Sequence, residues 1–140
     1  MLCGFGVPEM TVWTISTIAQ GAAVTLFAQL SPTEKVGFEC SFGGLSVLTQ
    51  AELFKDLPPT SEFVLNLGGS NFKADTVYML IASPPFWSGS FGNKSEMLSA
   101  LNASKHFEVS ILDRTLKVDL DREKVAGFLD SCSKQVEVDQ

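Results

Sequence analysis

Most of the chain alternates between apolar and polar residues with a period of two, which is the pattern of half-buried β-strands. Residues that favour turns, such as Gly, Pro, Ser and Asn, separate these runs at intervals of roughly ten residues. We therefore expect about eight short strands, at residues 11–18, 24–30, 36–42, 45–48, 63–67, 72–81, 106–111 and 116–120. Because tight turns connect many of them, neighbouring strands should pair antiparallel.

The end of the chain changes period and predicts a helix over 122–133. Asp119 or Asp121 can cap its first turn with a side-chain oxygen. A shorter helix is expected near 94–103, where an Asn with a Glu three residues later resembles a capping box. The apolar face of the terminal helix would consist of Val125, Phe128, Leu129 and Cys132.

These elements predict a mainly β fold, either an antiparallel β-sandwich or a strongly curved sheet with the terminal helix packed across it. A chain of 140 residues suggests a single domain. We place that domain at 10–134, with an N-terminal appendage at 1–9 and a polar tail at 135–140.

Composition narrows the class of partner. The formal net charge of −6 argues against nucleic-acid binding, which requires a basic surface. An acidic surface suits a basic partner protein, although mild negative charge also simply keeps a protein soluble. No apolar run reaches the roughly 20 residues that span a membrane. The first 30 residues lack the basic start and continuous apolar stretch of an export signal, so we expect a cytoplasmic protein or one whose leader was removed.

Chemical motifs are missing from the sequence. Its three cysteines form no CxxC pair, and with one histidine they supply no metal centre. His106 has no Ser, Cys or Asp at the spacing of a catalytic triad, and the Gly-Gly pairs have no basic residue beside them to meet a phosphate. Asp113 fits a turn. We therefore expect no enzyme, no metal and no cofactor.

The stretch 83–92 is the longest without strand or helix periodicity, since it holds two prolines and two glycines. Its part 84–92 carries three large rings, Phe86, Trp87 and Phe91. Aromatic residues on an irregular segment often supply the contact area of a protein-binding site, so we predict that this loop contacts a partner protein. The alternative is that the rings fold back and plug one end of the sandwich.

Cys40 and Cys132 each fall on the inward apolar face of their element, which makes them candidates for a disulfide. In an oxidising compartment they would be bridged, whereas in the cytoplasm both would be reduced, buried and apolar.

A family resemblance accompanies these features. An early Trp13, a central Phe38-Glu39-Cys40 strand and the closing 116–132 segment resemble the small exported proteins of the invasion-associated locus B type. The resemblance covers most of the chain from Met10 and implies a β-rich, periplasmic and non-enzymatic protein. The chain departs from that family in lacking an export signal.

A second resemblance is to the periplasmic inhibitors of c-type lysozyme. It rests on a loosely matched strand from Phe38 to Val47 and on the later Phe86-Trp87 pair. Those inhibitors end soon after that pair, whereas this chain continues through a hairpin and a helix, so no inhibitory residue is carried over. Three functions are open from the sequence: an exported protein-binding domain, a cytoplasmic acidic inhibitor of the phage or immunity type, and a carrier of a small apolar ligand.

Overall fold

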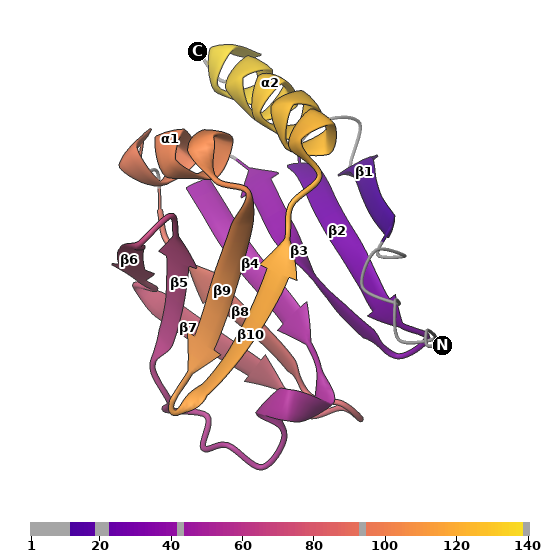
Figure 1. The fold of residues 1–140 in the computed structure, drawn as a ribbon, viewed down its shortest axis with the longest axis vertical. Coiled ribbons are helices and arrows are strands. Elements are labelled where there is room, and N and C mark those ends of the chain that lie inside the picture. Colours follow the sequence, from indigo (N-terminus) through magenta and orange to yellow (C-terminus); the bar gives the residue numbers. More distant parts are fainter. Residues whose placement is uncertain (1–11, 19–22, 42–43, 93–94, 139–140) are drawn as a thin grey trace, which may run out of the picture.

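The computed structural model describes residues 12–18, 23–41, 44–92 and 95–138. Over these ranges the chain forms a β-sandwich of ten strands in two antiparallel sheets, with two α-helices side by side at one end (Figure 1). The predicted mainly β fold with a C-terminal helix is confirmed. The proposed appendage at 1–9 lies outside the described residues.

The larger sheet has six strands in the order β1-β2-β3-β4-β8-β7. Its first four strands form a meander in which each pairs with the next: β1 (Val12–Ile18), β2 (Ala23–Ser31), β3 (Glu34–Ser41) and β4 (Gly44–Gln50). Two later strands complete it, β8 (Phe86–Ser90) beside β4 and β7 (Thr76–Leu80) at the edge.

The smaller sheet has the order β10-β9-β5-β6 and lies in front of the larger sheet in Figure 1. Its strands are β5 (Phe63–Leu67), β6 (Ser70–Lys73), β9 (His106–Ile111) and β10 (Arg114–Asp119). The remaining elements are the 3-10 turn η2 (Glu52–Phe54), the helix α1 (Ser95–Ala103) and the terminal helix α2 (Arg122–Val138).

One predicted strand, 72–81, is two strands in different sheets. The backbone N–H of Ala74 still donates to Phe63 O in the smaller sheet (3.0 Å), whereas that of Asp75 donates to Ser90 O in the larger sheet (2.8 Å). Between Ala74 and Asp75 the chain therefore crosses from one layer of the sandwich to the other. This crossing places β7 at the outer edge of the larger sheet.

The terminal helix begins where the sequence predicts and continues further. Asp121 Oδ1 accepts hydrogen bonds from the N–H groups of Glu123 (3.1 Å) and Lys124 (3.2 Å), so Asp121 is the cap. On the predicted apolar face, Val125, Phe128 and Cys132 are buried and Leu129 is half-buried. The helix runs to Val138, so 135–138, expected as a polar tail, is helical backbone.

Phenylalanine rings from three elements meet at the centre of the core. Phe38 on β3 packs against Phe107 on β9 and against Phe128 on α2, with ring centroids 5.0 and 6.3 Å apart. At the β1 end, Trp13 contacts Phe107 and donates its indole N–H to Asp119 O (3.1 Å). The smaller sheet and α2 therefore both pack on the inner face of the larger sheet.

The prediction that 83–92 is irregular is wrong over Phe86–Ser90. These residues form β8, an interior strand of the larger sheet between β4 and β7. Pro84 and Pro85 precede the strand, so they do not interrupt its hydrogen bonds. Gly89 lies within it at a buried position because the ring of Phe63 approaches its backbone closely.

We predict that Gly89→Ala destabilises the protein by about 1–3 kcal/mol, since a Cβ there would lie 2.8 Å from Phe63 Cδ1 and force the ring to move. Urea titration of the purified variant measures this loss. Ser88→Ala is the matched control, because Ser88 is half-buried on the opposite face of β8 and its change should stay within about 0.5 kcal/mol. Equal stability of the two variants would contradict the packing of Phe63 on Gly89.

Candidate functional site

The structure separates the three rings that the sequence singled out. Trp87 and Phe91 have no exposed area, whereas Phe86 is half-buried. The indole N–H of Trp87 donates to Phe54 O (3.3 Å), and the Phe91 ring meets that of Phe63 edge-on at 6.1 Å. Two of the three rings therefore belong to the core, which agrees with the alternative of a plug, and a contact surface made from them is not present.

The strand beside them exposes an apolar surface instead. Of the six large hydrophobic residues that are exposed in the described chain, three lie together at the end of β7. Their exposed fractions are 67% for Tyr78, 56% for Leu80 and 93% for Ile81. We call these three residues the β7 surface. Scattered exposed apolar residues are ordinary on proteins, but a contiguous group is typical of an interaction site.

The backbone of β7 is also open to a partner. Phe91, directly after β8, donates its N–H to Leu45 O on β4, whereas Ser90 O accepts from Asp75 N. Successive residues along β8 therefore bond alternately to β4 and to β7. In the β7–β8 register Tyr78 therefore bonds toward β8. The N–H and C=O groups of Val77 and Met79 point away from the sheet, and β7 is its terminal strand.

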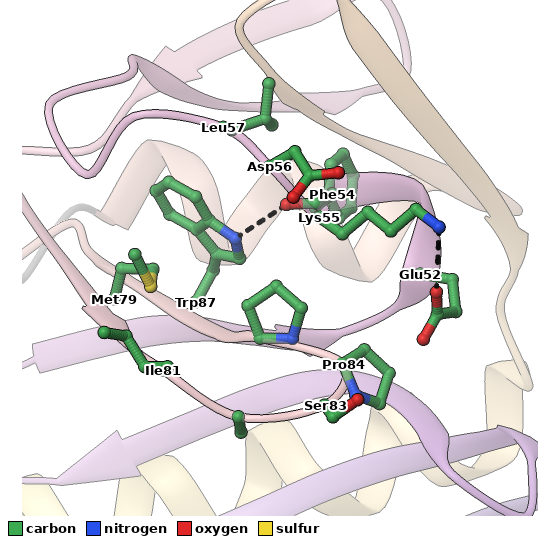
Figure 2. Close-up of a pocket in the computed structure, with 12 residues that line it drawn as sticks. Glu52, Phe54, Lys55, Asp56, Leu57, Met79, Ile81, Ser83, Pro84 and Trp87 are labelled. Carbon is green, nitrogen blue, oxygen red and sulfur yellow. Dashed lines mark hydrogen bonds and ion pairs between the residues drawn. The ribbon is translucent and has the colours of Figure 1, made fainter.

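A pocket with a volume of about 540 Å³ adjoins the β7 surface (Figure 2). Met79 and Ile81 line one wall, and Glu52 and Lys55 lie on the other side. The buried Trp87 also lines the pocket. Ile81 belongs to both, so the pocket adjoins the β7 surface at the end of the strand. Tyr78 and Leu80 alternate with Met79 and lie on the other face of β7.

The walls of this pocket are held from both sheets. Arg114 on β10 donates from Nη1 to the carbonyl oxygens of Leu53 (3.0 Å) and Lys55 (2.6 Å). From the larger sheet, Trp87 bonds the carbonyl of Phe54, and Gln50 Nε2 donates to Pro84 O (2.9 Å). The site is therefore formed before a ligand arrives, which lowers the entropic cost of binding.

The rim of the pocket carries a net negative charge. Lys55 Nζ lies 3.6 Å from Glu52 Oε1, and both side chains are more than half exposed. Asp56 is exposed, has a left-handed backbone (φ 63°) and makes no ion pair with a described residue. One uncompensated carboxylate at the rim favours a positively charged group on whatever binds there.

A second pocket, of about 620 Å³, lies between the two helices, where Leu98 on α1 and Leu129 on α2 contribute half-buried apolar walls. The described residues that line it all belong to α1 and α2, so no strand edge borders it. We therefore assign the candidate site to the β7 surface.

Cys40 on β3 and Cys132 on α2 lie at disulfide distance, with Cα atoms 5.7 Å apart. Both are almost fully buried. The predicted pairing is therefore borne out in geometry, and the pair joins the terminal helix to the interior of the larger sheet.

The remaining titratable residues form no recognisable centre. His106 is exposed at the start of β9, Asp113 lies in the β9–β10 turn and Asp121 caps α2. Within the described ranges, no group of three or more His, Cys, Asp and Glu side chains is placed to hold a metal ion. The helices described are too short or too polar to cross a membrane.

Comparisons with protein-family models, with curated proteins and with solved structures found no match to this chain.

The sequence carried a signal for the β7 surface that its periodicity obscured. Residues 77–82 are six consecutive apolar residues, Val-Tyr-Met-Leu-Ile-Ala. A strand that covers a core on one face needs only alternate apolar residues, so such a run leaves apolar side chains on the outer face as well. Met79 packs toward the core, and its neighbours Tyr78 and Leu80 are the exposed ones.

Proposed function

We propose that this protein is a non-enzymatic protein-binding domain that contacts a partner protein through the β7 surface and the adjoining pocket. The observation that carries the proposal is the edge of β7, which pairs with no second strand among the described residues and has three exposed apolar side chains on it or directly after it. Sheet edges of this kind accept an extended segment of another chain, with the backbone supplying affinity and alternate side chains supplying specificity.

Charge supports a partner that is basic around its contact. The chain carries a net charge of −6, and Asp56, which makes no ion pair with a described residue, adds a carboxylate to the lining of the pocket. Complementary charge speeds association and disfavours acidic competitors. The same property would serve the alternative function of an acidic inhibitor that blocks a basic protein surface.

An oxidising compartment, periplasmic or extracellular, is the location we propose. The support is the buried pair of Cys40 and Cys132 at bonding distance, since disulfides persist mainly outside the cytoplasm. The resemblance to small exported proteins of the invasion-associated locus B type points to the same compartment. A cytoplasmic inhibitor would instead keep both thiols reduced.

A carrier of a small apolar ligand has less support. Rings from both sheets and from α2 meet around Phe38, which fills the centre of the sandwich. The two pockets described above are lined in part by exposed residues at the surface. A carrier needs a cavity that buries most of its ligand.

The test compares two charge insertions on opposite edges of the same sheet. Leu80→Asp places a carboxylate in the β7 surface, whereas Val12→Asp changes an equally exposed apolar residue (62%) on β1. Proteins retained by the immobilised wild type are identified, purified and titrated against each variant. We expect Leu80→Asp to weaken binding at least about tenfold, or about 1.4 kcal/mol, and Val12→Asp to leave it unchanged. A partner that binds all three proteins equally would place the site elsewhere.

A further inference from the structure

We infer that the edge of β7 also pairs with the β7 edge of a second copy of this chain, forming a reversible dimer that shields the site when no partner is bound. This inference rests on the proposed function, because it assigns an occupant to the same site. The need for an occupant comes from the edge itself. Exposed edges in natural sheets are usually protected by charged residues, prolines or bulges.

β7 has none of these protections. Its five residues, Thr-Val-Tyr-Met-Leu, include no charge and no proline, and its pairing with β8 runs without a register shift. The opposite edge, β1, is also uncharged, but its exposed face carries one apolar residue, Val12, beside the polar Thr14 and Ser16. Apolar side chains beside a free backbone edge distinguish β7 as the strand that gains most from pairing.

The sequence of β7 fits itself in one antiparallel register. The backbone N–H and C=O groups of Val77 and Met79 point away from β8, toward the open edge. A two-fold axis at Tyr78 therefore places Val77 opposite Met79 of the second copy. Each such pair exchanges two backbone hydrogen bonds, and the symmetry supplies two pairs. The Tyr78 side chains of the two copies then face each other at a non-hydrogen-bonded position, where cross-strand side chains approach most closely.

Charge permits this arrangement in spite of the acidity of the chain. In the register centred on Tyr78, Asp75 lies opposite the uncharged Ile81 of the second copy. No like charges therefore oppose each other along the paired strands, whereas most other approaches of two molecules with a net charge of −6 are repulsive.

The small size of the contact sets its strength. A strand of five residues is only about 17 Å long, so the interface falls below the roughly 1,200–2,000 Å² of stable complexes. We therefore expect a monomer–dimer equilibrium that depends on concentration. A partner protein that binds the same edge would displace the second copy.

Sedimentation equilibrium of the full chain tests the inference. For the wild type, the average mass should rise from 15.1 kDa toward twice that value as concentration increases. Tyr78→Lys and Tyr78→Glu should each stay monomeric, because the two-fold axis brings like charges together, and an equimolar mixture of the two should dimerise again. Val12→Lys, on the other edge, should behave as the wild type.

Two results would overturn the inference: a wild type that stays monomeric at millimolar concentration, or a dimer that survives Tyr78→Lys. Neither would disturb the proposed function, which is tested with Leu80→Asp against a purified partner. A monomeric wild type that still loses its partner on Leu80→Asp separates the two conclusions.

Discussion

Replacing both Cys40 and Cys132 with alanine should lower the free energy of unfolding by about 4–5 kcal/mol. The two cysteines are 92 residues apart in sequence and lie at disulfide distance between β3 and α2. In the chain-entropy model, a cross-link stabilises the fold by removing conformations from the unfolded chain, and the effect grows with the length of the closed loop. A loop of this length lies near the upper end of that range.

Urea titration with and without a reductant measures this effect. The reduced wild type should match the double alanine variant, and the reductant should leave that variant unchanged. Alkylation of the denatured, non-reduced wild type gives an independent check by intact mass. Labelling of one of the three cysteines, Cys3, supports the bridge, whereas labelling of all three contradicts it.

Truncation of Phe128 to alanine should destabilise the protein by about 3–5 kcal/mol, because burial is lost and a cavity is left in the core. Phe128 is completely buried and its ring lies 6.3 Å from that of Phe38. Thermal unfolding and urea titration both report this change.

Lys124→Ala is the matched control for Phe128→Ala, since Lys124 is exposed one turn earlier on the same helix. We expect it to change stability by no more than about 0.5 kcal/mol. If Phe128→Ala is equally mild, then α2 does not cover the inner face of β3 in solution.

The parts of the fold that could be predicted from the sequence are those with uninterrupted periodicity. The 106–120 hairpin alternates strictly, and Val125, Phe128 and Cys132 repeat at helical spacing, so both elements and their buried faces follow directly. Their inward apolar positions also made Cys40 and Cys132 disulfide candidates, and the structure places the two at disulfide distance. In each case a short stretch of sequence is enough to indicate which side of the strand or helix faces the core.

The parts that could not be predicted depend on neighbours distant in sequence. The inward residues of β8 are Trp87 and Gly89, and the buried Phe91 follows the strand directly. The glycine interrupts the apolar pattern because the Phe63 ring occupies the space of a side chain there. The alternation of apolar and polar residues shows which face of a strand is buried, but it does not show which strands are neighbours in the sheet. That β8 pairs with β4, leaving β7 at an edge, is a non-local choice that no short window of sequence contains.

The inner face of the larger sheet is covered by both the smaller sheet and α2, and this arrangement affects folding during synthesis on the ribosome. The β1–β4 meander precedes β9 and α2 in the chain and can pair locally, but its inner face is closed by those two later elements. A nascent chain therefore presents an open apolar sheet until residues 106–132 have been synthesised, and during that time aggregation and chaperone binding compete with folding. Substitutions in 106–132 should accordingly reduce the yield of native protein in cells more than their effect on the finished fold would indicate.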